Sequence, residues 1–430
     1  MSRFEPSGPL RGSLRPPSDK SISHRAALIA AMGSREIYVE SFLDAADTSS
    51  TLSAVKAVGA EVEPSKTGDG ELGVVIKGVG LRDARSAEID VGNAGTLLRL
   101  LPGWLSGQVG QGWTLDGDES IRRRPVDRVA VPLREMGADL KAREERLPPL
   151  HVRGASLHGI TYEMPIASAQ VKSCLLFAGL LAEGETRVVE PLPSRDHTER
   201  MLLAAGASIE RDGDAVVVQP TDQLEPVSVS VPADISSAAF FIVAALLIEG
   251  SEVVLDDVNV NPTRTGLLTI LRRMGAEIGL LAEDGVGGEP IASLRIRSAS
   301  LQATDVGGPE IPLAIDELPL VALAACFAEG TTTIRDAEEL RRKESDRIET
   351  VTAALNALGG KVEPTPDGMV IEGTGGLRGG TIDSHGDHRI AMLGAVAGLA
   401  SKEGVEVRGM EAAAVSYPGF EQDLGSLLGG

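Results

Sequence analysis

An internal repeat constrains the fold of this chain more than any other feature of its sequence. A glycine closes a helical segment and opens an alternating strand in "VGAEVE", "MGADLK", "AGASIE", "MGAEIG" and "LGGKVE", at Gly59, Gly137, Gly206, Gly275 and Gly359. Each glycine is expected to end a helix. The residues that follow are apolar at every second position, which is typical of a half-buried strand.

A second pattern alternates with the first and marks six further helices. Each has a polar cap, an apolar run of three to four turns, and then a glycine and a β-rich strand. The segments begin "SDKSISHR", "GNAGTLLR", "ASAQVKS", "ADISSAAF", "IDELPLV" and "GDHRIAM" and run over residues 19–33, 93–107, 168–184, 234–250, 316–330 and 387–404. Six copies of one α/β unit are therefore predicted.

Five junctions against six capped helices leave one unit incomplete. The chain ends in a helix-like segment, while residues 8–17 form a strand-like segment with no helix before it. We expect the first residues to complete the last unit. At 430 residues the chain exceeds the usual size of one hydrophobic core. The prediction is two lobes of three units each: residues 18–228, and residues 1–17 with 229–430.

Composition narrows the possible functions. A net charge of -21 argues against a sequence-independent nucleic-acid binder, which needs a basic surface, but not against a small anionic ligand. Cys174 and Cys326 lie in apolar helical runs, where we expect buried thiols rather than a disulfide or a nucleophile. The segment "MSRFEPSGPL" does not resemble a secretory signal, and no apolar run is long enough to cross a bilayer. A cytoplasmic protein is expected.

The six capped helices also suggest a function. A helix N-terminus presents unpaired N–H groups and a partial positive charge, which suit an anion. Any one cap can be a simple helix start, but residues with strong donors stand just inside several of them: Lys20, Ser21, Arg25, Arg99, Gln170, Lys172 and Arg389. Three such termini in each lobe, facing each other, would form an electropositive cleft between the domains.

Three further segments are rich in charge, and each has an alternative interpretation. In "SIRRRPVDR" we expect Arg124, which precedes a proline, to point into the cleft and the other two arginines to lie on the surface. In "SRDHTER", Arg195 is a candidate ligand, although a solvated turn fits equally well. "LRRKESDRIE", residues 340–349, fits either an exposed helix face with i,i+4 ion pairs or a device that binds an anion.

Nine motifs in this order resemble a known family. They are "SDKSISHR", "NAGT", "RRP", "SAQVKS", "SRDHTE", "NPTR", "DELP", "RRKESDR" and "DHRIAM", and they span nearly the whole chain. The set resembles the 5-enolpyruvylshikimate-3-phosphate synthases, which are enolpyruvyl transferases. The resemblance implies a two-domain inside-out α/β barrel with three β-α-β-α-β-β repeats per domain. It also implies that both termini lie in one domain and that the active site lies in the interdomain cleft.

The resemblance further implies a reaction of the shikimate pathway, which leads to chorismate and the aromatic amino acids. The enolpyruvyl group of phosphoenolpyruvate passes to the 5-hydroxyl of shikimate 3-phosphate, and phosphate leaves through a tetrahedral intermediate. The family uses no metal or organic cofactor. Neither nucleic acid nor membrane is an expected partner, and a monomer is expected.

Site residues carry over only where the motifs match. The resemblance places Lys20, Gly95, Arg124, Gln170, Arg347 and Arg389 around phosphoenolpyruvate. Around shikimate 3-phosphate it places Lys20, Ser21, Arg25, Ser168, Ala169, Gln170, Arg195, Asp316 and Lys343. The catalytic candidates are Lys20, Asp316, Glu344 and His388.

The family also suggests how the catalytic candidates divide the work. Asp316 matches the base near the 5-hydroxyl. Glu344, with Lys20 and His388, matches groups implicated in protonating the methylene carbon. We further expect "RRKESDR" to begin a helix on which Lys343, Glu344 and Arg347 share a face, and Arg341, Arg342, Asp346 and Glu349 to be ordinary solvated charges.

Two other functions are considered as alternatives to this one. A UDP-N-acetylglucosamine enolpyruvyl transferase would carry a cysteine five residues before the arginine of its "Arg-Pro" motif, and Glu119 stands there. A non-catalytic anion binder would have no use for acids such as Asp316 and Glu344 beside its anions. The chain also departs from one class of the family that it resembles, since Ser416 of "AVSYPGF" stands where that class has a lysine.

Overall fold

The computed structural model describes residues 1–67, 71–286 and 288–428 and divides into two compact units. Unit 1 comprises Met1–Pro17, Pro232–Asp284 and Pro290–Gly430, and unit 2 comprises Ser18–Val231 with Gly285–Glu289. Residues 229–231 belong to unit 2 because strand β14 (Val229–Ser230) pairs in parallel with β3. The expected lobe boundary at residue 228 lies three residues earlier.

Unit 2 contains three four-stranded sheets in the part of the chain that the structure describes, and all three share one pairing pattern. The first two strands of each sheet are parallel and the remaining pairs are antiparallel. The strand orders are β14-β3-β5-β4, β6-β7-β9-β8 and β10-β11-β13-β12. The predicted repeat is therefore present three times in this unit.

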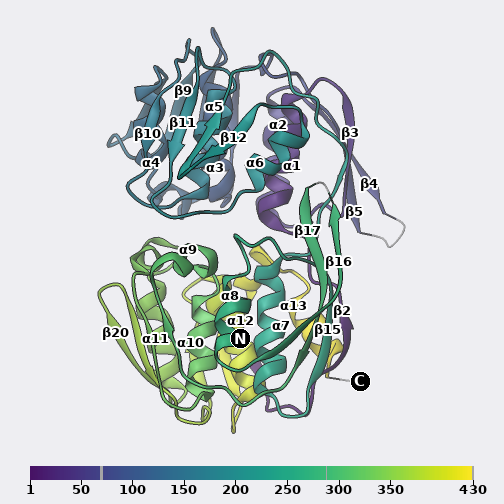
Figure 1. Ribbon diagram of the computed structural model, residues 1–430, viewed down its shortest axis with the longest axis vertical. Coiled ribbons are helices and arrows are strands. Elements are labelled where there is room, and N and C mark those ends of the chain that lie inside the picture. The colour runs from purple at the N-terminus through teal and green to yellow at the C-terminus, as the bar shows by residue number, and fades with distance from the viewer. Residues whose placement is uncertain (68–70, 287, 429–430) are drawn as a thin grey trace. The chain divides into compact units, whose positions relative to one another are not determined.

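The elements of unit 2 have these bounds (Figure 1). The strands are β3 (Glu36–Glu40), β4 (Glu61–Lys66), β5 (Leu72–Lys77), β6 (Ala87–Asp90), β7 (Gly112–Asp116), β8 (Asp139–Arg143), β9 (Leu147–Arg153), β10 (Thr161–Glu163), β11 (Thr186–Val189), β12 (Ile209–Asp212) and β13 (Ala215–Val218). The helices are α1 (Lys20–Met32), α2 (Ala46–Ala57), α3 (Gly95–Ser106), the 3-10 turn η1 (Ile121–Arg123), α4 (Asp127–Glu135), α5 (Ala169–Gly179) and α6 (His197–Ala204).

Unit 1 contains the other three repeats, with sheets ordered β16-β17-β15-β2, β18-β19-β21-β20 and β1-β23-β22. The strands are β1 (Ser2–Phe4), β2 (Arg11–Leu14), β15 (Glu252–Asn259), β16 (Glu277–Val286), β17 (Glu289–Arg297), β18 (Asp305–Val306), β19 (Thr331–Ile334), β20 (Lys361–Thr365), β21 (Gly368–Glu372), β22 (Gly380–Asp383) and β23 (Val405–Arg408). The helices are α7 (Ile235–Leu247), α8 (Gly266–Arg273), α9 (Ile311–Ala314), α10 (Leu318–Phe327), α11 (Arg347–Ala357), α12 (His388–Ala400) and α13 (Phe420–Ser426), with 3-10 turns η2 (Gly308–Glu310), η3 (Glu338–Arg342) and η4 (Met410–Val415).

The N-terminal segment completes two sheets of unit 1 rather than one. Strand β1 (Ser2–Phe4) pairs antiparallel with β23 and so completes the last repeat, as expected of the first residues. The strand within residues 8–17, however, is β2, and it pairs in parallel with β15 of the fourth repeat. Its expected place in the last repeat was wrong, because β2 supplies the parallel partner that the fourth repeat needs beside β15.

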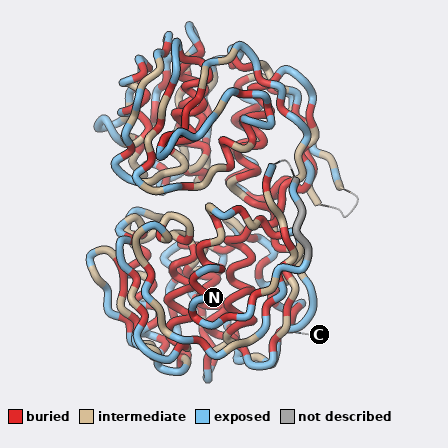
Figure 2. Tube along the Cα trace, in the orientation of Figure 1, coloured by how far each residue is buried: buried red, intermediate tan, exposed pale blue. Residues whose placement is uncertain are grey.

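The first helix of each repeat lies inside its unit. Nearly every residue of α1, α3 and α5 in unit 2, and of α7, α10 and α12 in unit 1, is buried (Figure 2). Helices α7, α10 and α12 contact one another, and α3 contacts both α1 and α5. The helices form the interior and the sheets the outside, which explains why these helical segments are apolar on all faces. The inside-out arrangement is as expected.

Local signals located the helix ends well. Gly59, Gly137, Gly206, Gly275 and Gly359 all adopt positive φ angles, between 85° and 113°, directly after α2, α4, α6, α8 and α11. Glycine adopts this left-handed conformation without a steric penalty. The five predicted helix ends are confirmed.

Candidate active site

Four of the six inner helices have a side-chain N-cap. Asp19, Ser168, Asp234 and Asp387 each accept a hydrogen bond from a backbone N–H in the first turn of α1, α5, α7 and α12. The expected caps of the other two helices were wrong: Ala94 precedes α3 and Glu317 precedes α10, and neither makes a side-chain cap bond. Their polar neighbours, Asn93 and Asp316, bind cationic side chains instead.

The inner helices of unit 2 are bonded to one another close to their N-termini. Arg25 of α1 donates from Nη2 to Oγ of Ser173 in α5, at 2.9 Å. Arg99 of α3 donates from Nη1 to Oε1 of Gln170 in α5, at 3.1 Å. All four residues lie within the first two turns of their helices. The three N-termini with their partial positive charges are therefore gathered in one region of unit 2.

Lys20 is the first residue of α1, and its ammonium group is partly accessible. Nζ lies 3.2 Å from Oδ2 of Asp47, and the side chains of the two residues are 24% and 8% exposed. Sequence reasoning missed Asp47, since an acid in the first turn of a helix is common and carries no special signal. The pair gives Lys20 a defined position while its side chain stays in contact with solvent.

Arg124 and Gly95 lie together at the start of α3. Arg124 donates from Nη2 to Oδ1 of Asn93 at 2.9 Å. A Cβ atom at position 95 would lie 2.9 Å from Nη1 of Arg124, so only glycine leaves the guanidinium where it is. Arg122 and Arg123 are exposed and paired with Asp116 and Glu119, as expected of surface arginines.

Arg195 lies in the loop that connects β11 to α6. It is half-buried, as is Asp196 after it, and the buried Ser194 and His197 lie just outside this pair. Thr198 in the first turn of α6 accepts from Nε of Arg25 at 2.7 Å and shares a hydrogen bond with Ser173 at 2.6 Å. The loop that carries Arg195 is thus joined through α6 to α1 and α5.

A second cluster lies in unit 1 around Asp316. Its carboxylate is 3.3 Å from Nζ of Lys343, 3.3 Å from Nη1 of Arg347 and 3.8 Å from Nη2 of Arg389. Arg389 also lies 3.5 Å from Glu317, which is 1% exposed and was not singled out from the sequence. We refer to Asp316, Glu317, Lys343, Glu344, Arg347, Asp387 and Arg389 as the acid–base cluster.

Arg347 is the centre of this cluster. It is 1% exposed and bonds Asp387 at 2.8 Å and Glu344 at 2.7 Å in addition to Asp316. Burial disfavours the charge on Asp387, but the neighbouring charge and hydrogen bonds of Arg347 outweigh it and lower the pKa of the carboxyl group. His388, which follows Asp387, is buried at the first position of α12.

The segment "LRRKESDRIE" folds differently from the prediction. Residues 338–342 form η3, Lys343 is extended, and α11 begins only at Arg347, because Asp346 caps it by accepting from the N–H groups of Ile348 and Glu349. The single helix face expected for Lys343, Glu344 and Arg347 is therefore wrong, although Asp316 and Arg347 still bring the three side chains together.

Two of the residues expected to be ordinary solvated charges have structural roles. Asp346 is the helix cap of α11. Arg341 is 25% exposed and bonds Asp346, Glu349 and the carbonyl oxygens of Thr365 and Pro366. Arg342 is about half exposed and pairs with Glu338, as expected of a solvated surface charge.

The two clusters differ in charge balance. In unit 2, five cations lie at or near the N-terminal ends of the inner helices or in the loop before α6, and two buried acids lie at the start of α1 and beside Lys20: Asp19 and Asp47. We refer to Lys20, Arg25, Arg99, Arg124 and Arg195 as the cation cluster. In unit 1, three cations meet four acids. The cluster of unit 2 suits the binding of polyanions, whereas the acid–base cluster contains the groups that proton transfer needs.

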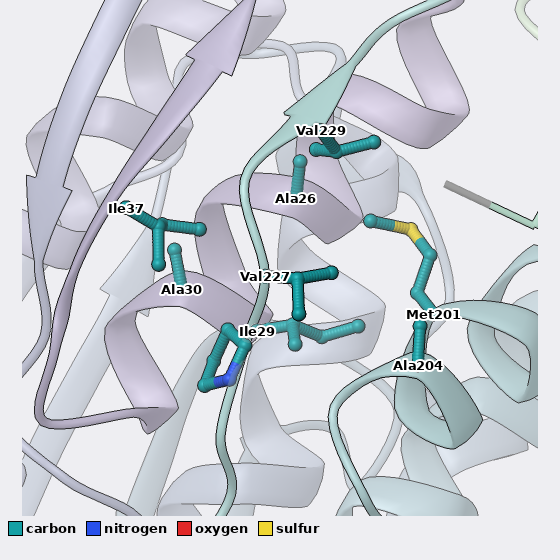
Figure 3. Close-up of a pocket in the computed structure, with 9 residues that line it drawn as sticks. Ala26, Ile29, Ala30, Ile37, Met201, Ala204, Val227 and Val229 are labelled. Carbon is teal, nitrogen blue, oxygen red and sulfur yellow. The ribbon is translucent and has the colours of Figure 1, made fainter. Parts of the chain in front are cut away.

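An apolar hollow lies elsewhere in unit 2 (Figure 3). It is lined by Ala26, Ile29, Ala30, Ile37, Met201, Ala204, Pro226, Val227 and Val229. None of these side chains can donate a hydrogen bond to an anion, so the hollow does not fit a phosphorylated ligand.

Other kinds of site are not found within the described residues. No group of three His, Cys, Asp or Glu side chains is placed to hold a metal ion, and no helix in this part of the chain has the length and apolarity to span a membrane. Cys174 and Cys326 are free and buried, as expected. Burial raises the pKa of both thiols, that of Cys326 to about 12, so neither is a ready nucleophile.

Known proteins resemble this chain over almost its whole length. The sequence profile of the family "EPSP synthase (3-phosphoshikimate 1-carboxyvinyltransferase)" matches residues 4–424. The 3-phosphoshikimate 1-carboxyvinyltransferase of Methylococcus capsulatus is 49% identical over 96% of this chain and 94% of its own, and that of Alkalilimnicola ehrlichii is 48% identical over 98% and 94%. A structure of EPSP synthase from Acinetobacter baumannii has a TM-score of 0.88 at 42% identity, covering 99% of this chain and 97% of that one.

Proposed function

The chain belongs to the EPSP synthase family, and from this we infer that it transfers the enolpyruvyl group of phosphoenolpyruvate to the 5-hydroxyl of shikimate 3-phosphate. It is a transferase of the shikimate pathway, and it releases phosphate. The reaction changes no oxidation state, so no redox cofactor takes part in its balance.

The observation that carries this function is the cation cluster of unit 2. Three helix N-termini are held together by Arg25, Arg99 and their partners, and Lys20 projects from the first of them. Both substrates carry a phosphate and a carboxylate, which prefer such donors. Ser21, Arg25, Ser168, Ala169, Gln170 and Arg195 are the proposed contacts of shikimate 3-phosphate in this unit. Gly95, Arg124 and Gln170 are those of phosphoenolpyruvate, and Lys20 serves both.

The acid–base cluster of unit 1 provides the remaining groups. Lys343 and Asp316 are proposed to bind shikimate 3-phosphate, and Arg347 and Arg389 to bind phosphoenolpyruvate. Arg347 bonds three carboxylates in the structure. We therefore expect a ligand to take the place of Glu344 or Asp316 on one of its nitrogens.

The proposed chemistry needs two proton transfers and one elimination. The 5-hydroxyl oxygen adds to C2 of phosphoenolpyruvate and gives up its proton to Asp316. The methylene carbon C3 takes a proton from Glu344, assisted by Lys20 and His388. The tetrahedral adduct then returns a proton from the methyl group to Glu344 and expels phosphate, which restores the double bond. The proton taken from the 5-hydroxyl leaves with the phosphate as hydrogen phosphate. The cations stabilise the charge on the departing phosphate, an effect worth about 3–4 kcal/mol for a well-placed donor.

The wider setting follows from the function. We propose that the chain acts as a monomer in the cytoplasm on small-molecule substrates, without a nucleic-acid or membrane partner. The net charge of -21 supports the absence of a nucleic-acid partner. A strongly acidic chain is repelled by the phosphate backbone of nucleic acid.

A phosphate-release assay tests the function directly. Phosphate should appear with phosphoenolpyruvate and shikimate 3-phosphate and not with UDP-N-acetylglucosamine as acceptor; the reverse preference would identify the sibling transferase. If no phosphate is released with either acceptor, the chain would be a non-catalytic anion binder.

Lys20→Met should abolish phosphate release, because the ammonium group that serves both substrates is lost. Circular dichroism should show a folded chain, since the Lys20 side chain is partly exposed. Lys361→Met is the matched control: Lys361 is exposed and paired with Glu372 outside both clusters, and its loss should leave the rate unchanged. Full activity of Lys20→Met would exclude the proposed role.

A further inference from the structure

Lys172 is a buried lysine to which the proposed reaction assigns no role. It stands in the first turn of α5, beside Ser173, and its side chain is 0% exposed. Nζ lies 3.1 Å from both carboxylate oxygens of Glu190 and 2.6 Å from Oε1 of Glu199. A buried ammonium group is costly unless it is paired and hydrogen-bonded, and here both conditions are met.

The same ammonium group holds the backbone of the β11–α6 loop. Nζ donates to the carbonyl oxygen of Ser194 at 3.3 Å. That carbonyl belongs to the peptide that leads into Arg195. Lys172 therefore joins helix α5 to the backbone from which the Arg195 side chain departs.

Glu190 holds the loop from its other side. Its Oε1 accepts from the backbone N–H of Ser194 at 3.1 Å and from the Ser194 hydroxyl. Arg211 of β12 donates to Oε2 at 3.3 Å. Glu190 and Ser194 thus close the loop between them, because they bond each other and both bond the buried ammonium group of Lys172.

Glu199 links this arrangement to α6. It lies one residue after Thr198, which accepts from Arg25. Burial raises the pKa of Glu199 in spite of the nearby Lys172. Every side chain in this network belongs to unit 2 and is placed by α5, α6, β11 or the loop between them, apart from Arg211 of β12 and Arg25 of α1.

We propose that Lys172 and Glu190 are positioning residues for Arg195, and through it set the affinity for the acceptor's phosphate group. This assignment rests on the proposed function. Neither residue touches substrate in it; Lys172 acts by fixing the Ser194–Arg195 peptide, so that the guanidinium meets the phosphate without first ordering the loop. A pre-ordered group binds more tightly because less conformational freedom is lost on binding.

The test is a kinetic comparison of Lys172→Met with the parent. KM for shikimate 3-phosphate should rise roughly tenfold or more, as expected when one charge-assisted contact is weakened. KM for phosphoenolpyruvate should change by less than about twofold, because Arg124 and Gly95 lie on other elements and Gln170 is held by its own bonds to Arg99 and Thr96 of α3. A general loss of structure would change both constants together.

A double-mutant cycle separates positioning from stability. If Lys172 acts through Arg195, the double variant Lys172→Met/Arg195→Ala should have the same KM for shikimate 3-phosphate as Arg195→Ala alone. Additive effects would overturn the assignment. Leu133→Ala, which removes a fully buried side chain of α4, should lower Tm without a selective change in either KM.

Glu190→Gln tests the same positioning role if Lys172→Met does not fold. It preserves the shape of the side chain and should raise the same KM, and Lys172→Arg should restore part of the parent's affinity. If the parent is active and the Lys172 and Glu190 variants have the same KM for shikimate 3-phosphate as the parent, the positioning role is overturned while the proposed function stands. A parent that neither binds shikimate 3-phosphate nor releases phosphate would overturn the proposed function and, with it, this assignment.

Discussion

Gly95 shows how an absent side chain can shape a binding site. A Cβ atom there would lie 2.9 Å from Nη1 of Arg124 and 3.2 Å from Nη1 of Arg99. Both contacts involve the ends of long side chains, which can move without disturbing the backbone. A substitution at this position should therefore change where the guanidinium groups lie and leave the fold intact.

We expect Gly95→Ala to raise KM for phosphoenolpyruvate about tenfold or more, since a shift of about 1 Å in a binding group is enough for such a loss. KM for shikimate 3-phosphate and Tm should stay close to the parent values. Steady-state kinetics and a thermal melt measure all three. Gly8→Ala, which meets no atom within 4 Å, is the control; an unchanged KM for phosphoenolpyruvate in Gly95→Ala would contradict the placement of Arg124.

His24 makes the stability of the chain depend on pH. Burial lowers the pKa of this imidazole from 6.5 to about 3, with Asp47 opposing the shift and Lys20 and Arg25 adding to it. The folded chain keeps His24 neutral while the unfolded chain protonates it below pH 6.5. The contribution to stability is thus fully present above pH 6.5 and is lost as the pH falls toward 3.

Between pH 6.5 and 5 this single group should reduce the free energy of unfolding by about 2 kcal/mol. Urea unfolding at the two pH values measures the loss, and His24→Asn should show a smaller pH dependence than the parent. The exposed His151 is the control residue, because His151→Asn should leave the dependence unchanged. Equal pH dependence in the parent and His24→Asn would rule out a neutral His24.

At the scale of elements, the packing of α3 against α5 depends on Gly103. A Cβ atom on Gly103 would lie only 2.1 Å from the carbonyl oxygen of Cys174. The obstacle is backbone inside a second buried helix, so it cannot rotate away. The helices approach closely because this residue has no side chain.

Gly103→Ala should therefore lower the free energy of unfolding by roughly 1–3 kcal/mol or more, as overpacking of a core does. Gly425→Ala is the matched control in helix α13, where nothing lies within 4 Å of the added Cβ. Alanine has the higher helix propensity, so this control should gain up to about 1 kcal/mol. Denaturant unfolding measures both, and a Gly103→Ala variant as stable as the parent would show that α3 and α5 can separate.

The segment at residues 340–349 shows where prediction of elements fails. Its alternating charges fit an unbroken helix, but Asp346 competes by bonding the N–H groups of Ile348 and Glu349, and helix α11 starts after it. A cap residue and a mid-helix acid look alike in a sequence. Lys343 lies near Asp316 and Glu344 near Arg347, although not through helical periodicity, and their roles toward the substrates stay predictions.

At the scale of the whole molecule, the proposed substrates need groups from both units. Lys20 and Arg124 belong to unit 2, whereas Lys343 and Arg389 belong to unit 1. Binding of two polyanions should draw such cations onto shared ligands and exclude water before the reaction.

Small-angle X-ray scattering tests this expectation. The radius of gyration should fall when both substrates are added at saturating concentration, and it should not fall in inorganic sulfate of the same ionic strength. An unchanged radius with both substrates would count against closure of the two units around them.

The sequence by itself determined the repeating architecture. Six helix–glycine–strand units follow from local rules: glycine ends a helix without a steric penalty, polar caps start one, and alternation specifies a strand. It also singled out Lys20, Arg124, Asp316 and Arg389, because strong donors and acids beside helix starts are detectable within a few residues of chain.

Only the tertiary structure decided which groups are partners. The Lys20–Asp47 pair joins residues 27 positions apart, and the bond from Lys172 to Ser194 spans 22. The two N-terminal strands join different sheets. Such pairings depend on how packed helices and sheets bring distant residues together, and burial then fixes their energies, since a charge removed from water must find its partner inside the fold. Neither the choice of partners nor the energy of their pairing can be read from the pattern of any one segment.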